Sequence, residues 1–501
     1  SRGCREMTFI KQFIIMDQSL EQQDFQHITL SCGKILSYHK NMHIQIQQND
    51  SGASEICLLG WAFQAEEGRK DPLEQIREIK DRAELEQQLE TWSGTWLLIY
   101  DKYIYLDACG LLGCFYTDSG IVSSSLSCIN EAVHRKSRNP RLRHNFGLDY
   151  YPGSGTAYPD THRLMPSQTY DLIKQRYESR SLYLGNKNYE TDEQRLDAVI
   201  HYFETILHNL VRTYNGRIML PLTGGYDSRT MMALLEYSGI DYSAFTLEHE
   251  NISELDREAP PKLAKIMNRG YEYRKREGKK SKERLQDFDR HCDGMAADED
   301  RNFYAYDQYP HDDQMTAILR AGVWACNYYF SYNWVEKAGL NLKKYTKKYV
   351  NIRRRKDMQD SLQNYFDYVN EDKQLLKWPV RFYRELRMGC WLSSLEQALT
   401  LIPNMDSFQL CNCSCILEIL GGVDLELLKG KKYQVRIIEK ICPQLLQVTL
   451  QNKENKFQKN SLFKTIKKDC QYIRNCWCCL DGDGRWKEPL KYMKKKIWRK
   501  K

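Results

Sequence analysis

The stretch Ile218-Met-Leu-Pro-Leu-Thr-Gly-Gly-Tyr-Asp-Ser-Arg-Thr-Met-Met-Ala-Leu-Leu-Glu236 decides the fold. It is typical of a buried strand, a glycine turn with hydroxyls, and the first turns of a helix. Residues 223–225 allow the backbone to approach a phosphate closely, Ser228 adds a hydroxyl, and the N–H groups at a helix start favour negative charge. Asp227 does not suit a bare anion, so it predicts a metal ion bound together with the phosphates.

This stretch resembles the pyrophosphate loop of the ATP pyrophosphatases, which activate a carboxylate or carbonyl as its adenylate and release pyrophosphate. It is not a Walker loop, because no Lys follows its glycines. The next predicted strand, residues 242–247, and the next predicted helix, residues 253–267, agree with the asparagine synthetase branch of that family. The resemblance implies an ATP site at Leu220, Pro221, Thr223, Gly224, Gly225, Tyr226, Asp227, Ser228 and Leu247, with Mg²⁺ at Asp227.

The apolar members of this set have a second interpretation. The resemblance implies that Leu220, Pro221 and Leu247 bracket the adenine. Any βαβ unit also places core residues at the ends of neighbouring strands, and the two interpretations are compatible.

Length and composition predict two large domains. The chain has 501 residues, of which 42% are hydrophobic and 12% aromatic. Its net charge of +8 suits anionic substrates such as ATP and does not by itself indicate nucleic-acid binding. Seventeen cysteines without a signal peptide are typical of reduced thiols, and no run of about eighteen apolar residues occurs. We therefore expect a cytoplasmic protein without a transmembrane segment.

The first 131 residues show short strands separated by turns. The predicted strands cover residues 27–30, 43–47, 55–63, 95–100 and 103–107, and a polar helix covers residues 81–90. Three segments, residues 58–63, 92–100 and 107–116, resemble the glutaminase half of asparagine synthetase. The resemblance implies an Ntn-hydrolase-like antiparallel β-sandwich with flanking helices, followed by an α/β domain whose parallel sheet is of the adenine nucleotide α-hydrolase type.

The nucleophile of such a glutaminase is missing. A working enzyme of this class uses the thiol of an N-terminal Cys, whose α-amino group serves as the base. Residue 1 is Ser, and Cys4 is internal. Ser1 could act as an N-terminal hydroxyl nucleophile, but nothing after it resembles the expected opening strand. The family's β-lactam and carbapenam synthetases and lasso-peptide cyclases also lack the thiol and take nitrogen from the substrate's own amine. The resemblance therefore favours an amine or ammonia over glutamine, unless processing exposes Cys4.

A change in composition marks the passage between the two halves. Residues 135–166 are rich in Arg, Pro, Gly and Tyr and resemble the family's crossover segment. Residues 192–212 then show helical periodicity. We predict a glutamine amidotransferase-like domain at residues 1–180, a synthetase domain at residues 181–480 and a basic tail at residues 481–501.

The second metal-binding loop of the family is altered. Residues 317–330 lie where the family carries a loop whose carboxylate shares the magnesium. The matching position is Cys326, and Val323 replaces the Glu of asparagine synthetase. Because Cys lacks the hard anionic oxygen that Mg²⁺ prefers, Glu299 or Glu336 is the alternative second ligand. A catalytically impaired homologue is therefore a second interpretation of the chain.

Two charged side chains are candidates for the step in which the amine attacks. Residues 381–391 predict a helix on which Glu385 could accept a proton, although such a Glu is usually solvated or ion-paired. Residues 443–457 resemble the segment whose Lys stabilises charge at the adenylate. The resemblance gives that role to Lys453, with Lys456 or a plain solvated side chain as alternatives.

Two further features are expected to be structural. The clustered cysteines at residues 411–415 and 470–479 miss the paired C-x-x-C spacing of zinc sites, and Cys411 and Cys415 are expected one turn apart on a core helix. Residues 486–501 are basic with interleaved aromatics, which fits a solvated tail or a weak contact with an anionic surface. No specific nucleic-acid partner is expected.

Together these features predict an ATP- and Mg²⁺-dependent amide ligase similar to asparagine synthetase, which adenylates a carboxylate and transfers it to an amine or ammonia. The carboxylate would belong to a specialised metabolite, a peptide or a sugar acid. The alternatives are a binding or scaffold homologue and, if processing exposes Cys4, glutamine-dependent asparagine biosynthesis.

Overall fold

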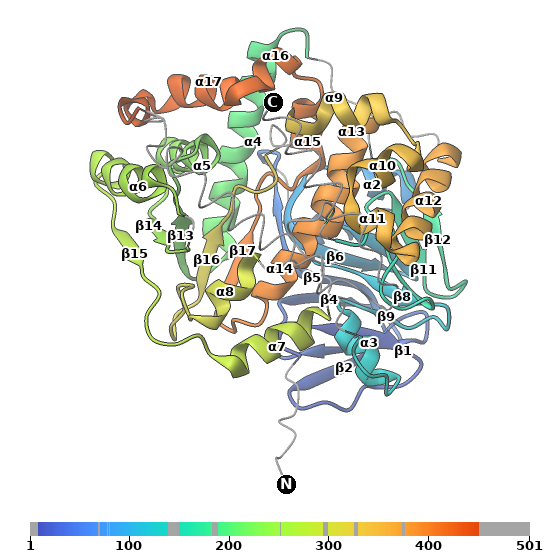
Figure 1. Cartoon of the computed structure of the whole chain (residues 1–501). Helices are drawn as coiled ribbons and strands as arrows, with labels where there is room; N and C mark the ends of the chain where they lie inside the picture. Colours follow the sequence, from blue (N-terminus) through green and yellow to red (C-terminus); the bar gives the residue numbers. More distant parts are fainter. Residues whose placement is uncertain are drawn as a thin grey trace. The chain divides into compact units, whose positions relative to one another are not determined.

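The structure is a computed structural model that describes residues 9–449, apart from residues 69–70, 78, 80, 139–147, 149, 183–188, 251, 294–298, 325–328 and 373–375 and the side chains of residues 299–300 and 329–332. Contacts divide the chain into two compact units, Ser1–Val448 and Thr449–Lys501. Every element described below belongs to the first unit (Figure 1).

Residues 13–179 form two six-stranded antiparallel sheets. The first has the order β10-β8-β9-β1-β3-β2, with β1 (Phe13–Met16), β2 (Phe25–Thr29), β3 (Ile35–His39), β8 (Phe115–Thr117), β9 (Val122–Ser123) and β10 (Thr161–Arg163). The second has the order β12-β11-β7-β6-β5-β4, with β4 (Ile44–Gln48), β5 (Ser54–Gln64), β6 (Trp92–Tyr100), β7 (Tyr103–Leu106), β11 (Gln168–Asp171) and β12 (Arg176–Ser179). Ile15 and Leu36 of the first sheet pack with Leu59 and Leu97 of the second. The two sheets therefore form a sandwich around one core.

Two glycines set the close approach of β5 and β6. Gly60 and Gly94 have φ values of +81° and +110°, a region that favours glycine. A Cβ atom on Gly94 would overlap the Trp61 carbonyl oxygen, and one on Gly60 would overlap the Thr95 carbonyl oxygen. The close antiparallel pairing of these strands therefore depends on both glycines.

A five-stranded parallel sheet follows, in the order β15-β14-β13-β16-β17. Its strands are β13 (Arg217–Pro221), β14 (Ser243–Leu247), β15 (Tyr271–Arg274), β16 (Thr316–Leu319) and β17 (Met405–Phe408). The chain builds one side of the sheet outward from β13 and then returns to its other side with β16. Ligands of open α/β sheets bind outside the carboxyl ends of the strands at such a switch point.

Successive side chains of these strands face opposite layers. Met219 and Ile318 pack in a cluster with Leu399 of α14 (Ser393–Leu399). Leu220 packs in the larger core, which includes the buried face of α4 (Asp192–Thr213). The predicted class, an antiparallel sandwich followed by an α/β domain with a parallel sheet, is confirmed.

The sandwich and the parallel sheet are tied together by buried polar contacts. The Lys11 ammonium donates to the Ile402 and Met405 carbonyl oxygens and to Asp406 Oδ1, the last at 2.9 Å. Asn412 Nδ2 donates to Asp107 Oδ1 at 2.8 Å. The boundary predicted near residue 180 therefore falls between β12 and α4 but inside a single compact unit.

Two elements correct the sequence predictions. The segment Phe13–Met16, where the sequence predicts no strand, is an internal strand of the first sheet, and it lacks alternation because all four residues are buried. The prediction that Cys411 and Cys415 share a helix is wrong. Cys411 lies in the turn after β17, and α15 (Ser414–Gly421) begins only after Cys413.

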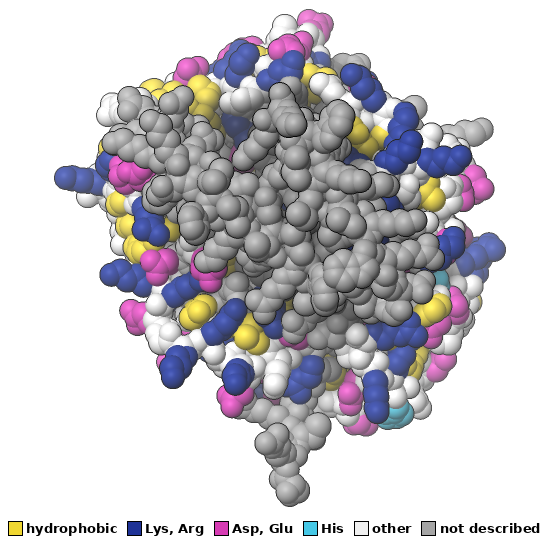
Figure 2. All heavy atoms as spheres, viewed as in Figure 1, with side chains coloured by type: hydrophobic (Ala, Val, Ile, Leu, Met, Phe, Trp, Pro, Cys, Tyr) yellow, Lys and Arg dark blue, Asp and Glu magenta, His cyan; other side chains and the backbone are white. Residues whose placement is uncertain are grey.

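Described Lys and Arg side chains are interspersed with Asp and Glu around the visible rim of the face in Figure 2. Among the helices of the described residues, none has both the length and the apolar character needed to cross a membrane.

A buried histidine on α7 (Lys282–Cys292) makes stability depend on pH. His291 is 5% exposed, its Nε2 lies 3.0 Å from the Gln397 carbonyl oxygen, and burial lowers its pKa to about 4. In the unfolded chain its pKa is about 6.5, so the unfolded state binds a proton more readily as the pH falls through this window. Because of His291, we expect the free energy of unfolding to fall by about 3 kcal/mol as the pH falls from 6.5 to 4. Urea denaturation at the two pH values measures this loss.

The control for this prediction is a variant that lacks His291 alone. His291→Gln should lose less stability over the same pH window than the wild type, whereas the half-exposed His201→Gln should follow the wild type. Equal acid sensitivity of His291→Gln and the wild type would refute the assignment.

Candidate functional site

The glycine loop lies between the end of β13 and α5 (Tyr226–Tyr237), beside the switch point of the parallel sheet. The Thr223 N–H donates to Ser228 Oγ at 3.1 Å, and the two hydroxyl oxygens are 3.0 Å apart. Gly225 is the N-cap of α5, and within the described residues no side chain caps this helix. The sequence-predicted members of the loop are therefore brought together at the amino end of a helix, an arrangement that favours anions.

Gly224 is the tightest point of this loop. A Cβ atom there would lie 2.5 Å from Leu255 Cγ and 3.0 Å from the Leu255 carbonyl oxygen. The Gly224 N–H donates to Asp256 Oδ1 at 2.8 Å, and Ser253, the N-cap of α6 (Glu254–Ile266), holds the other oxygen of that carboxylate. One loop amide is therefore occupied by the chain's own carboxylate.

The residues predicted to bracket the adenine lie in two different environments, the core and the edge of the sheet. Leu220 is fully buried in the core, whereas Pro221 and Leu247 are half-buried at the carboxyl ends of adjacent strands. Thr246 Oγ1 donates to the Leu222 carbonyl oxygen at 2.7 Å and links the two strand ends. The core interpretation therefore holds for Leu220, and contact of Pro221 and Leu247 with adenine stays a prediction.

Asp227 contacts a cation of the chain itself. Lys431 forms an ion pair with Oδ2, and Gln434 Nε2 donates to Oδ1 at 2.8 Å. Lys431 has φ +64°, follows Gly430 at φ +61°, and precedes α17 (Lys432–Ile441), which packs against α5. Sequence reasoning missed Lys431, because nothing in the local sequence links it to Asp227, which lies 204 positions away.

Arg229 holds the loop from the other side. Its guanidinium donates to the Gly224 carbonyl oxygen at 3.2 Å and to the carbonyl oxygens of Leu445 and Val448 at 3.1 and 2.7 Å. The side chain is 1% exposed, and burial lowers its pKa. Arg229 therefore fixes the loop to the segment that follows α17.

The loop after β16 brings no carboxylate to Asp227 among the described residues. The N–H groups of Gly322 and Val323 donate to Gln409 Oε1 at 2.8 and 3.3 Å, and Val323 is buried. Cys326 and the Glu299 side chain lie outside the described part of the chain, and Glu336 is exposed on α9 (Tyr329–Ala338).

These residues fit a metal ion poorly. Across the described residues no group of three or more His, Cys, Asp or Glu side chains could hold a metal. Asp227, the carboxylate predicted as the magnesium ligand, already contacts the Lys431 ammonium and the Gln434 side-chain amide. Mg²⁺ needs only one or two protein carboxylates when substrate phosphates complete its ligands, but Asp227 would first have to release Lys431.

Glu385 lies in a buried network on the π-helix η3 (Phe382–Leu392), where the sequence predicts an ordinary helix. Ser167 donates to Oε1 through both its N–H and its hydroxyl, and Tyr365 and Arg381 donate to Oε2 at 2.6 and 2.7 Å. Burial favours the neutral acid, but Arg381 and these hydrogen bonds outweigh it and hold the pKa of Glu385 below its usual value. The network gives Glu385 a structural role, while its proton transfer stays a prediction.

Several sequence predictions fall outside the described residues. They are Ser1, Cys4, Lys453, Lys456, the cysteines of residues 470–479 and the basic tail. The remaining cysteine cluster is buried, with the sulfurs of Cys413 and Cys415 3.2 Å apart.

Comparison with solved structures gives weak likenesses, two of which are described here. No family model and no curated protein matches the chain. The NMN synthetase from Francisella tularensis is 13% identical, with a TM-score of 0.18 over 47% of this chain and 94% of that one. The glutamine-dependent NAD+ synthetase from Acinetobacter baumannii, in complex with ADP, is 12% identical, with a TM-score of 0.16. The match covers 56% of this chain and 50% of that one. At these scores neither likeness bears on the fold or function of this chain.

Proposed function

We propose that this protein is an ATP-dependent, AMP- and pyrophosphate-forming amide ligase that adenylates a carboxylate and transfers it to an amine. The observation that carries the proposal is the glycine loop with two paired hydroxyls at an uncapped helix start, beside the switch point of a parallel sheet. Lys431 adds a positive charge next to that helix start. This combination suits the phosphates of a nucleotide.

In the proposed reaction the substrate carboxylate attacks the α-phosphate of ATP and pyrophosphate leaves into the loop. The loop amides and the hydroxyls of Thr223 and Ser228 would donate to the leaving oxygens, and Lys431 would offset their charge. An amine then attacks the acyl carbon and AMP departs. Such catalysis consists of positioning and charge stabilisation, so it requires no protein nucleophile.

A specific feature favours a second candidate, a binding or scaffold protein. Polar groups of the site already have partners within the chain. Asp256 accepts a hydrogen bond from a loop amide, and Lys431 and Gln434 both contact Asp227. A ligand would have to displace or share these contacts. A homologue that has lost ATP chemistry would keep such contacts because they stabilise the fold.

Titration calorimetry with Mg-ATP decides between the two candidates. For the ligase we expect micromolar binding to the wild type and a loss of at least about tenfold in affinity for Asp227→Ala, because the substitution removes the group that fixes Lys431 beside the loop. Lys431→Ala should weaken binding to a similar extent. Asp241→Ala, which removes a fully exposed carboxylate elsewhere in the same domain, is the matched control and should bind as the wild type does.

Unchanged or tighter binding by Asp227→Ala would contradict the ligase, and so would the absence of binding to the wild type in the presence and absence of carboxylates. Once binding is established, release of AMP and pyrophosphate in a survey of carboxylates and amines identifies the substrates. Failure of that survey to yield AMP with any amide would leave the scaffold candidate.

A further inference from the structure

A run of basic side chains lies on the helices that follow α9. Residues 337–356 contain nine Lys or Arg residues and no Asp or Glu. They include α10 (Leu342–Lys348), α11 (Val350–Arg354) and the start of α12 (Lys356–Glu371), and these three helices pack on one another. In Figure 2 several Lys and Arg side chains lie together at the upper right of the rim, where Figure 1 places α10 and α12. The run is therefore a surface feature of the fold.

Buried aromatic packing fixes which side of α10 faces solvent. Tyr345 is fully buried, and its ring lies edge-to-face on Phe366 of α12 with centroids 5.1 Å apart. It also packs edge-to-face on Trp334 of α9, with centroids 5.0 Å apart. The lysines of α10 therefore point outward. We call the exposed side chains of Lys343, Lys344, Lys347, Lys348 and Arg354 the basic surface.

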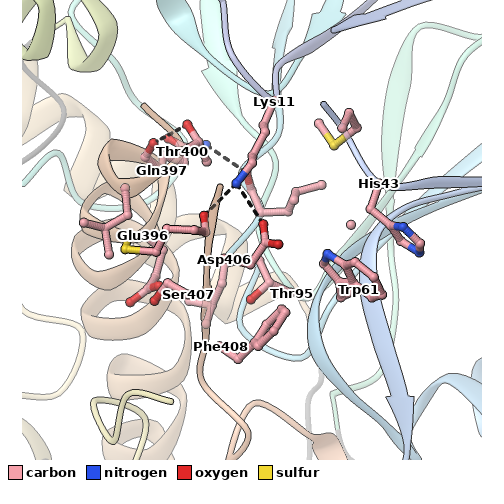
Figure 3. A pocket seen from close by; sticks show the side chains of 16 residues that line it. Lys11, His43, Trp61, Thr95, Glu396, Gln397, Thr400, Asp406, Ser407 and Phe408 are labelled. Atoms are coloured by element: carbon pink, nitrogen blue, oxygen red, sulfur yellow. Dashed lines mark hydrogen bonds and ion pairs between the residues drawn. The ribbon is translucent and has the colours of Figure 1, made fainter. Parts of the chain in front are cut away.

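The charges of the basic surface are not balanced within the described part of the chain. Like charges four residues apart on a helix destabilise it, and α10 has two such lysine pairs, one at residues 343 and 347 and one at residues 344 and 348. In the sandwich, by contrast, Lys11 pairs with Asp406 at 2.9 Å (Figure 3). Among the described residues no carboxylate pairs with Lys343, Lys347 or Arg354. An anionic partner would supply the missing counter-charge.

The aromatic side chains beside the basic surface favour lipid over nucleic acid. The Lys348 ammonium lies 3.6 Å from the ring centre of Trp334 and 5.3 Å from that of Tyr349. Bases of single-stranded nucleic acid stack on open aromatic faces, but Lys348 already covers one face of Trp334. Trp334 and Tyr349 are both half-buried. Half-buried Trp and Tyr beside Lys are typical of a protein surface at a membrane–water interface.

We propose that the basic surface binds the surface of an anionic phospholipid bilayer. Its Lys and Arg side chains would lie among the anionic headgroups, with Trp334 and Tyr349 at the edge of the contact. Each Lys or Arg near such a surface contributes about 1 kcal/mol, which is about fivefold in the partition coefficient. None of these residues belongs to the glycine loop, so the proposal does not depend on the proposed function.

Cosedimentation of the full chain with phosphatidylcholine vesicles, with and without phosphatidylserine, tests the proposal. We expect the wild type to bind only the vesicles that contain phosphatidylserine, and to bind them more weakly as NaCl is added. The variant Lys343→Gln/Lys347→Gln/Lys348→Gln/Arg354→Gln should lose at least about a hundredfold in the partition coefficient.

The matched control is Lys40→Gln/Lys174→Gln/Lys262→Gln/Lys440→Gln. It changes the net charge equally, at exposed lysines that each pair with a carboxylate. It should stay within about threefold of the wild type, because charges far from the contact are screened. Both variants keep residues 449–501, so any contribution of the basic tail is the same in both.

The proposal is overturned if the wild type does not bind the phosphatidylserine vesicles, or if the surface variant binds them as the wild type does. It is also overturned if the surface variant and the control lose equally, because net charge alone would then explain binding. If the fourfold surface variant does not fold, Lys343→Gln/Lys347→Gln carries the test, with an expected loss of about 25-fold.

Fluorescence anisotropy with single-stranded and duplex DNA separates the two anionic partners. We expect DNA to bind more weakly than phosphatidylserine vesicles at the same ionic strength and the same concentration of negative charge. Tighter binding of DNA, reduced in the surface variant but not in the control, would assign the basic surface to nucleic acid and overturn the lipid proposal.

Discussion

Replacing Glu385 with alanine is expected to lower the free energy of unfolding by about 3–5 kcal/mol. The carboxylate is fully buried and forms the centre of a network with Arg381, Tyr365 and Ser167. Its removal leaves the buried Arg381 guanidinium with Asp372 as its remaining acidic partner. Urea denaturation at pH 7 of the wild type and Glu385→Ala measures the loss.

Two comparisons make this measurement specific. Glu283→Ala removes an exposed carboxylate and should change the free energy of unfolding by less than about 0.5 kcal/mol. The double variant Arg381→Met/Glu385→Leu should lose less than the sum of the single variants, because both substitutions remove the same Arg381–Glu385 contact. The loss of the Asp372 partner is a cost that Arg381→Met and the double variant share. If Glu385→Ala lowers the free energy of unfolding by less than about 1 kcal/mol, the ion pair does not stabilise the fold. The predicted role of Glu385 in proton transfer would then be the one to test.

Gly94→Ala is expected to lower the free energy of unfolding by about 3 kcal/mol or more. The substitution forces a non-glycine residue to φ +110° and drives its Cβ atom into the Trp61 carbonyl oxygen, so β5 and β6 must separate. Gly33→Ala is the matched control, because Gly33 has φ +83° but open space around its Cβ position. It should lose only the backbone cost of about 1–2 kcal/mol.

The difference between the two glycine variants in urea denaturation therefore measures the close contact of the strands alone. Equal losses would show that the sheet relaxes around the added atom.

The sequence was informative where one local pattern determines one local structure. The nine-residue segment 55–63, a nearly continuous apolar run preceded by a turn signal, and the glycine turn at residues 223–225 each specify their own backbone, and the structure places β5 and the loop there. The strand at residues 13–16 was missed because a strand buried on both faces has no alternation. Periodicity alone does not distinguish such a run from other buried segments.

The partners of the candidate site were less predictable, because they depend on contacts between distant segments. Lys431 meets Asp227 across 204 residues, and Ser167 meets Glu385 across 218. Spacing along the chain contains no signal for such pairs. The same limit explains why Glu385 was assigned a chemical role from its helix alone.

The Lys11–Asp406 contact also has a consequence for synthesis. The two residues are 395 positions apart, and a ribosome adds about 5–20 residues per second, so on the order of 20–80 s separate their emergence. Throughout that interval the neighbouring β1 is complete while β17 does not yet exist. Nascent chains of this protein are therefore expected to need protection by chaperones until the last strand of the parallel sheet has left the ribosome.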